Sequence, residues 1–277
     1  MVQLNILITI HLSTFKIKIM KKKMLLFAYL FLCLLYVQAQ DFKYKLANSK
    51  EAKVSLELDA DDIRIEGYNG DELLIKGGSN EPIPEQAKGL KPLYNSNVDN
   101  TGIGLAVNME GGVLKIEKAS RKSAKYTIRV PNKVSILFVQ TNWQGSSITI
   151  SNVESDLEVK TNNADIKLNN ITGPVVASSI SGNFTAVFGN LNQSKPCAVS
   201  LVSGEIDVTL PTSAKTTLQM KSVTGEIYSD LDLNLKGGKD SMPKVGGGHQ
   251  VEGHLNGGGV SLKLNTVSSN IYVRKQK

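Results

Sequence analysis

One short pattern returns along the chain and constrains its fold more than any other feature. A turn of small residues leads to a carboxylate or amide, and an apolar residue then opens an alternating strand. The clearest copies are Thr161–Ile166, Ser179–Phe184, Leu201–Ile206, Ser222–Ile227 and Thr266–Ile271. Repeats of about 20 residues built from strands and turns are typical of solenoids, in which each coil buries its apolar side against its neighbours. The repeat therefore predicts an all-β, single-chain β-solenoid, a β-helix-like stack of short strand-turn units.

The alternation within each copy supports strands. Apolar and polar residues alternate with period two in Ile166-Lys167-Leu168 and in Ile206-Asp207-Val208, so one face is buried and the other is wet. A second strand is expected midway through each period, around Leu157, Val175, Val199 and Leu218. Each coil then has two strands. The longer interval between Ile227 and Ile271 is interpreted as two periods with one degraded copy.

Residues 1–39 predict a signal peptide. Lys21-Lys22-Lys23 forms a basic segment, Met24 to Tyr36 is apolar, and Val37-Gln38-Ala39 places cleavage between Ala39 and Gln40. The apolar run is shorter than the ~20 residues that span a bilayer, so we expect no permanent transmembrane anchor. Residues 1–19 precede a more typical leader, and we expect translation to start at Met20 or Met24, the upstream segment being a mis-assigned start.

Removal of the leader changes the charge balance. The leader holds five lysines and no acidic residue, which leaves 27 basic against 25 acidic residues, a net charge of +2 instead of +7. The remaining chain has no basic stripe with interleaved aromatics, so we expect no nucleic-acid partner. Cys33 is lost with the leader, and Cys197 alone cannot form an intramolecular disulfide.

Residues 40–277 are expected to form one repetitive domain with two interruptions. The first, the loop excursion 78–112, is either a cap over the first coil or a specific binding surface, since loops carry function more often than frameworks do. The second, the glycine-rich loop 237–259, lacks the Lys-Ser/Thr of a phosphate loop. It contains His249, Glu252 and His254, but glycines disfavour the helix that would align the two imidazoles, so no metal site is predicted.

The repeat also predicts a row of polar residues along one edge of the solenoid. If the coils are in register, Asp165, Asn183, Glu205 and Glu226 form a ladder at the strand spacing of ~4.8 Å. Such a ladder could serve a polysaccharide-active enzyme, because paired carboxylates cleave glycosides. The residues also follow tight turns, where local hydrogen bonding explains them. No partner Arg, His or aromatic sugar platform is evident, and the single tryptophan, Trp143, is interpreted as core. We therefore predict no catalytic residue, cofactor or metal, and keep the ladder as a ligand-facing surface.

Several elements together resemble a known family. They are Tyr126–Pro131, the Gly-Glu-Ile and Ser-Gly-Asn turns, the strand end Leu210-Pro211 and the late turn Asn256–Gly259. Over roughly Lys53 to Val273 they resemble the putative adhesin family of exported bacterial proteins, a domain of unknown function similar to the head domains of autotransporter adhesins. The resemblance implies a β-solenoid surface or envelope protein without assigned catalytic residues.

The function expected from the sequence is therefore a non-enzymatic, adhesin-like binding or structural module. It would be exported to the periplasm, the outer surface or the extracellular space, with a glycan or an envelope protein as partner. The alternatives are a polysaccharide-active β-helix enzyme that uses the carboxylate ladder and an envelope-stress accessory protein that acts through a partner. Exposed end coils also make self-association an expectation.

Overall fold

The computed structural model describes residues 41–46, 52–59, 62–78, 84–90, 97–120, 122–235 and 249–277. The chain divides into two units, residues 1–39 and residues 40–277, and all described residues belong to the second. The expected signal peptide and its cleavage site between Ala39 and Gln40 lie outside the described residues, so they stay predictions. Among the described residues, no helix is long and apolar enough to cross a membrane.

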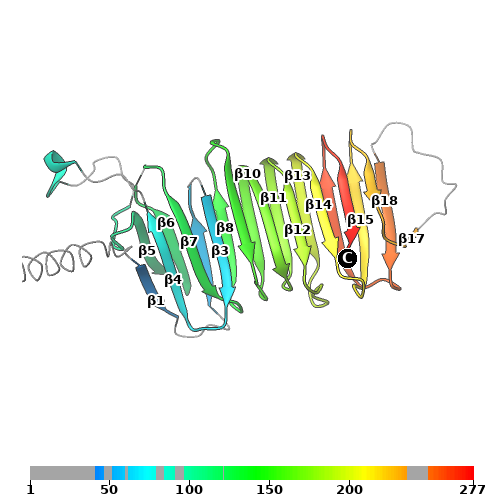
Figure 1. Ribbon diagram of the computed structural model, residues 1–277, viewed down its shortest axis with the longest axis horizontal. Helices are drawn as coiled ribbons and strands as arrows, with labels where there is room; N and C mark the ends of the chain where they lie inside the picture. Colours follow the sequence, from blue (N-terminus) through cyan, green and yellow to red (C-terminus); the bar gives the residue numbers. More distant parts are fainter. Residues whose placement is uncertain are drawn as a thin grey trace, which may run out of the picture. The chain divides into compact units, whose positions relative to one another are not determined.

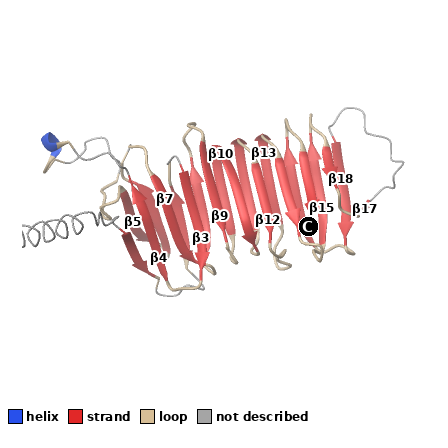
Figure 2. Cartoon of the chain, in the orientation of Figure 1, coloured by secondary structure: helices blue, strands red, loops and turns tan. Residues whose placement is uncertain are grey.

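The described residues form strands almost throughout (Figure 2). In chain order the elements are β1 (Asp41–Lys45), β2 (Lys53–Glu57), β3 (Asp62–Tyr68), β4 (Glu72–Gly78), the 3₁₀ turn η1 (Glu85–Ala87), β5 (Leu105–Glu110), β6 (Val113–Lys118), β7 (Lys125–Pro131), β8 (Ser135–Gln140), β9 (Ser146–Ser151), β10 (Leu157–Ile171), β11 (Val175–Ser181), β12 (Phe184–Phe188), β13 (Cys197–Ser203), β14 (Ile206–Leu210), β15 (Thr216–Ser222), β16 (Ile227–Ser229), β17 (Asn234–Leu235), β18 (His249–Leu255), β19 (Val260–Thr266) and β20 (Ile271–Lys275).

The strands are arranged in two layers, which we call sheet A and sheet B (Figure 1). Sheet A has the order β1-β4-β7-β3-β9-β10-β12-β14-β20-β16. Sheet B has the order β5-β6-β2-β8-β10-β11-β13-β19-β15-β18-β17. The long strand β10 pairs in sheet B with its first half and in sheet A with its second half. Each coil therefore contributes one strand to each layer, and the predicted β-solenoid is confirmed.

The core lies between the two layers and is built by the stacking that the sequence spacing predicts. Ile148 pairs with Ile166, Ile166 with Phe184, and Phe184 with Ile206, each on the next coil. These four side chains are fully buried and belong to one hydrophobic cluster that takes residues from both sheets. The strands expected midway in each period are also present, as the first half of β10 and as β11, β13 and β15.

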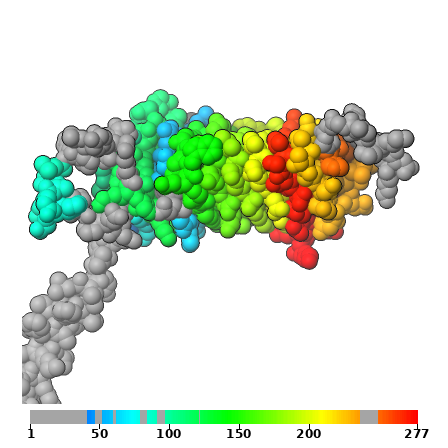
Figure 3. All heavy atoms as spheres, turned by 90° about the horizontal axis from the view of Figure 1, so that it is seen from above, coloured from blue at the N-terminus to red at the C-terminus, as the bar shows by residue number. Residues whose placement is uncertain are grey.

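Both terminal coils are inserted into the stack instead of lying at its ends. The coil β2–β3 pairs with β6–β7 on one side and with β8–β9 on the other. The coil β19–β20 lies between β13–β14 and β15–β16, so the red band of Figure 3 has yellow neighbours on both sides. The interpretation of the long interval before Ile271 as two periods with a degraded coil is therefore wrong. That segment contains β17 and β18, which add antiparallel strands beyond β15 before the chain turns back.

Antiparallel strands also close the other end of the solenoid. β4 and β1 continue sheet A beyond β7, and β5 continues sheet B beyond β6. The described part of the 78–112 excursion thus contains the 3₁₀ turn η1 and the cap strand β5. At the opposite end the outermost strands are short, with three residues in β16 and two in β17. Short edge strands reduce edge-to-edge pairing with other chains.

Candidate functional site

The polar ladder expected from the repeat lies at the corner where each coil passes from sheet B to sheet A. The Asn183 backbone N–H donates to Asp165 Oδ1 at 2.9 Å, and the Glu205 backbone N–H donates to Asn183 Oδ1 at 3.0 Å. The Glu226 backbone N–H donates in the same way to Asn270 Oδ1 at 2.9 Å. Side-chain oxygens of one coil therefore satisfy backbone donors of the next coil, which is the turn chemistry that the sequence favours.

Tight packing at this corner explains its glycines. Gly204 has a φ of +138°, and a Cβ atom there would lie 2.0 Å from the carbonyl oxygen of Gly182. Gly182 has a φ of +107°, and its Cβ atom would lie 2.2 Å from the Ala164 oxygen. Only glycine combines this left-handed backbone with so close an approach between coils. The corner is therefore a rigid, closely stacked edge.

The order of the ladder differs from the prediction. Because the last coil is inserted, Asn270 lies between Glu205 and Glu226, as the backbone bonds from Ile206 to Asn270 and from Ile271 to Glu226 show. Glu205 and Glu226 are thus two strand spacings apart, about 9.6 Å, instead of one. Their carboxylates contact other groups: Glu205 Oε1 accepts from the Tyr272 hydroxyl at 3.5 Å, and Glu226 Oε1 lies 3.5 Å from His249 Nε2.

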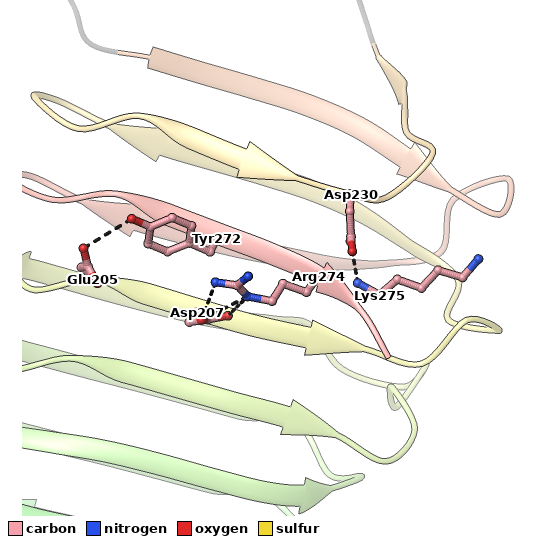
Figure 4. A network of polar contacts seen from close by, with 6 residues as sticks. All are labelled: Glu205, Asp207, Asp230, Tyr272, Arg274 and Lys275. Atoms are coloured by element: carbon pink, nitrogen blue, oxygen red, sulfur yellow. Dashed lines mark hydrogen bonds and ion pairs between the residues drawn. The ribbon is translucent and has the colours of Figure 1, made fainter. Parts of the chain in front are cut away.

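A cluster of aromatic and charged side chains lies beside this corner on the outer side of sheet A (Figure 4). We call it the Tyr272 cluster, and it consists of Glu205, Asp207, Tyr228, Tyr272 and Arg274. The rings of Tyr228 and Tyr272 are stacked, with centroids 5.4 Å apart and planes 11° apart. The Arg274 guanidinium lies 5.3 Å from the centre of the Tyr272 ring. Tyr228 is 52% exposed, so the cluster presents an aromatic surface to solvent.

Arg274 is held by a forked contact with Asp207. Its Nε donates to both carboxylate oxygens at 2.9 and 3.2 Å, and its Nη2 donates at 3.0 Å. The hydrogen bonds to Asp207, together with the charge of that carboxylate, raise the pKa of the Arg274 guanidinium. Next to it, the Lys275 backbone N–H donates to Asp230 Oδ1 at 2.7 Å (Figure 4). These contacts fix the cation over the tyrosine ring.

Strand alternation and the inserted coil create the Tyr272 cluster. Asp207, Tyr272 and Tyr228 occupy the same register position on β14, β20 and β16, each following a residue of the repeat that points inward. The expectation that no arginine, histidine or aromatic group lies near the ladder is therefore wrong. The signal in the sequence is that Tyr228 and Tyr272 each follow the isoleucine of a repeat copy. Their contact depends on the two copies being neighbours, which the chain order conceals.

Trp143 is not a core residue. It lies in the loop between β8 and β9 and is 62% exposed. Its carbonyl oxygen accepts from Asn163 Nδ2 at 3.0 Å, and the same loop accepts at Thr141 from Asn162. The backbone of this loop is thus attached to the next coil, while the indole faces solvent.

The histidines of the glycine-rich loop do not come together. In β18, strand alternation directs Glu252 and His254 to one face and His249 to the other. His249 contacts Glu226, and His254 Nδ1 lies 3.1 Å from the Thr217 hydroxyl. Over the described ranges, no group of three or more His, Cys, Asp or Glu side chains could hold a metal ion. Residues 236–248 of this loop lie outside those ranges.

The described end of the 78–112 excursion is a tightly bonded turn. The Asp99 carboxylate accepts three backbone N–H groups, from Thr101, Gly102 and Gly104, each at 2.9 Å, and the Thr101 hydroxyl at 2.9 Å. Burial acts to raise the pKa of Asp99, but these hydrogen bonds together outweigh it and lower the pKa below 3.8. The Tyr126 hydroxyl donates to the Ile103 carbonyl at 3.0 Å, and burial, with the Asp99 charge, raises the pKa of Tyr126 to about 12. This turn supports the cap strand β5.

The comparison with protein families identifies the fold. The family described as Toastrack DUF4097 matches residues 132–274, which is more than half of the chain. The chain belongs to this family. The resemblance seen in the sequence is thereby confirmed, and the match covers the Toastrack coils from β8 to β20. No curated protein matches the chain in sequence.

Three of the solved structures that match this Toastrack chain have low sequence identity to it. A "putative cell adhesion protein" from Clostridium sporogenes is 13% identical, with a TM-score of 0.45 over 85% of this chain and 99% of that one. A "putative adhesin" from Bacteroides fragilis is 13% identical, with a TM-score of 0.34 over 85% and 96%. A "putative lipid binding protein" from Parabacteroides distasonis is 13% identical, with a TM-score of 0.27 over 87% and 98%. At such scores these names describe those proteins and not this chain.

Proposed function

We propose that this Toastrack protein is an exported, non-enzymatic, adhesin-like binding module of the periplasm or cell surface, with a glycan as its ligand. The observation that carries the proposal is the Tyr272 cluster. The exposed ring of Tyr228, stacked on the half-buried Tyr272, offers an apolar area with a polar tip, at little cost in side-chain entropy. Arg274 and the carboxylates of Asp207 and Glu205 stand beside the rings and can exchange hydrogen bonds with sugar hydroxyls.

The solenoid supports this role by keeping the cluster rigid. The three strands that carry it, β14, β20 and β16, pair through a parallel ladder. The inward residues of β14 and β20, among them Ile206, Ile271 and Val273, are fully buried, and Ile227 of the edge strand β16 is partly buried against the same core. A ligand that binds there would not have to order the backbone, which lowers the entropic cost of binding. Weak contacts of this kind can also repeat along the polar outer side of sheet A, so a long ligand would gain affinity from several coils.

The test uses the chain from Gln40 to Lys277 on a panel of acidic and neutral glycans, with and without calcium. Binding of the wild-type chain should fall by at least about tenfold, which is about 1.4 kcal/mol, in the Tyr228→Ala variant. Trp143→Ala is the matched control, because it removes another exposed aromatic side chain far along the sequence from the cluster. Equal binding by both variants, or no glycan bound by the wild-type chain, would contradict the proposal.

A polysaccharide-active enzyme is the second candidate function, because Tyr272 lies next to Glu205 and His249 lies next to Glu226. A retaining glycosidase needs two carboxyl groups only about 5 Å apart, whereas the backbones of these two residues are separated by about 9.6 Å. Reducing or unsaturated ends released by the wild-type chain, and lost in the double variant Glu205→Gln with Glu226→Gln, would favour the enzyme. Membrane proteins that co-purify with the chain, without any glycan binding, would favour the envelope-stress accessory protein.

A further inference from the structure

The outer side of sheet B carries no charged residue on its two adjacent strands β11 and β13. The outward positions of these strands alternate with buried ones and form what we call the uncharged face, which consists of Val176, Ser178, Ile180, Ala198, Ser200 and Val202. Val176, Ile180 and Val202 are 46%, 42% and 50% exposed. The corresponding outer positions of sheet A on β10, β12 and β14 include two charged residues, Lys167 and Asp207, and one apolar residue, Val187. An exposed, uncharged surface on which apolar side chains lie on either side of a serine row is a candidate interaction site.

The strands that flank the uncharged face carry opposite charges at the same register position. Glu158 of β10 is in register with Val176 of β11, and Lys263 of β19 is in register with Ala198 of β13. Since Val176 and Ala198 are themselves partners, the four residues form one row across the sheet, with an acid at one end and a base at the other. The row has its apolar pair in the middle.

The two neighbouring rows are also uncharged on β11 and β13. The next row runs from Lys160 through Ser178 and Ser200 to Asn265. The row after it contains Ile180 and Val202, and it is extended by Val267, which directly follows β19 and is 44% exposed. In these three rows the charged residues that flank the uncharged face are Glu158 and Lys160 on β10 and Lys263 on β19, and Lys221 of β15, in register with Asn265, lies beyond them.

From this arrangement we infer that the uncharged face is a homodimer interface, on which a second copy of the chain packs face to face. The two copies are related by a two-fold axis that runs parallel to the strands, between β11 and β13. Such an axis exchanges β11 with β13 and β10 with β19, and keeps each residue in its own row. Glu158 then faces Lys263 of the second copy, and this ion pair occurs twice because the interface is isologous. Val176 faces Ala198, and Ile180 faces Val202, at the ~10 Å separation of packed sheets.

The charges select this axis over the other simple one. A two-fold axis perpendicular to the strands would keep each strand opposite itself and reverse the order of the rows. Glu158 forms an ion pair with Lys160 of its own strand at 2.6 Å, and this axis would place Lys160, in the middle row, opposite Lys160 of the second copy. Lys263 would face Val267, which directly follows β19, and would gain no acidic partner. Like charges that face each other across an interface cost free energy, whereas complementary pairs determine register and partner.

The available area indicates a weak dimer. The uncharged face is only two strands wide, so the contact has to include the flanking strands on each side. Six strands from β8 to β15 at ~4.8 Å spacing, each presenting about six residues at ~3.3 Å, give a surface of roughly 29 by 20 Å. That is about 580 Å² per copy and about 1,160 Å² for the pair, at the lower end of specific interfaces. The dimer is therefore concentration-dependent, and its subunits exchange.

Sedimentation velocity of the chain from Gln40 to Lys277, from about 5 to about 500 µM, tests the interface. The wild-type chain should shift reversibly from monomer to dimer. Val202→Glu should weaken the dimer at least about tenfold, because each substitution places two carboxylates in the interface. Val202 is half exposed in the single chain, so the fold should be kept, which circular dichroism checks. Thr185→Glu, at an exposed outward position of sheet A, is the matched control and should leave dimerisation unchanged.

A charge exchange tests the axis itself. Lys263→Glu and Glu158→Lys should each weaken the dimer, because each creates two like-charge pairs, and the double variant should restore it. A chain that stays monomeric at every concentration, or a double variant no stronger than the single ones, would overturn the inference. So would binding of the monomer to phosphatidylcholine vesicles that Val202→Glu abolishes, since the occupant of the face would then be a lipid surface. These outcomes do not depend on glycan binding at the Tyr272 cluster.

Discussion

The inserted last coil makes a prediction about where the solenoid is stabilised. Ile271 lies only six residues from the end of the chain, yet its side chain is fully buried between Ile206 and Ile227. If the coils were stacked in chain order, Ile271 would belong to the outermost coil and Ile227 to the one before it. Substitution of each isoleucine by alanine therefore distinguishes the two arrangements.

The expected losses in the free energy of unfolding follow from burial. Isoleucine to alanine removes three carbon groups, worth about 0.8 kcal/mol each, or about 2.4 kcal/mol of transfer free energy. At Ile271, coils on both sides limit relaxation, so the cavity adds to this loss and the total should be about 3 to 4 kcal/mol. Ile227 is only partly buried, on the edge strand β16, and its substitution should cost about 1 kcal/mol.

Urea unfolding of the chain from Gln40 to Lys277, followed by circular dichroism, measures both losses. The comparison is valid if the slope of the free energy against urea is the same in both variants, because a changed slope would mean a changed unfolding reaction. A loss for Ile227→Ala equal to or larger than that for Ile271→Ala would refute the inserted coil.

Three further predictions concern the corner, the cap and the core. Gly204→Ala should destabilise the chain by more than about 2 kcal/mol in the same assay, because its Cβ atom would clash with the Gly182 oxygen and its backbone is left-handed. Gly145→Ala is the control, since a Cβ atom there would have no atom closer than 3.9 Å, and its free energy of unfolding should differ from that of the wild type by no more than about 0.5 kcal/mol. Asp99→Asn should lower the melting temperature at neutral pH, because it removes the charged carboxylate that the turn stabilises. The pKa of Asp99 in the folded chain is below 3.8, so the difference in melting temperature between wild type and variant should disappear as the pH falls through this folded pKa. Cys197, fully buried with a raised pKa, should react with a thiol reagent only after unfolding.

Each of these predictions has a result that would contradict it. Equal stability of Gly204→Ala and Gly145→Ala would show that the corner can relax. A melting-temperature difference for Asp99→Asn that persists well below pH 3.8 would show that the loss does not come from the charged carboxylate. Rapid labelling of Cys197 in the native chain would show that the coil around β13 opens readily.

The local features of this protein could be predicted from its sequence because they depend on neighbouring residues. Period-two alternation places Ile166 and Leu168 inward and Lys167 outward whatever the rest of the chain does. The small residues and glycines before Asn183 and Glu205 set the corners, because only they permit the close approach of one coil to the next. Coil length, strand positions and the turn role of the polar ladder followed from these patterns.

Only the tertiary structure decided which coils are neighbours. The inward residues of different copies are similar in size, so the hydrophobic pattern lets Ile271 stack on Ile206 or beyond Ile227 equally well. The choice depends on long-range pairing, in which β18 turns antiparallel on β15 and brings the chain back to insert β19 and β20. That choice brings Tyr228 next to Tyr272 and separates Glu205 from Glu226. It also puts Lys263 in the row of Glu158. The surfaces that we assign to function therefore depend on the order of the coils, which no local pattern encodes.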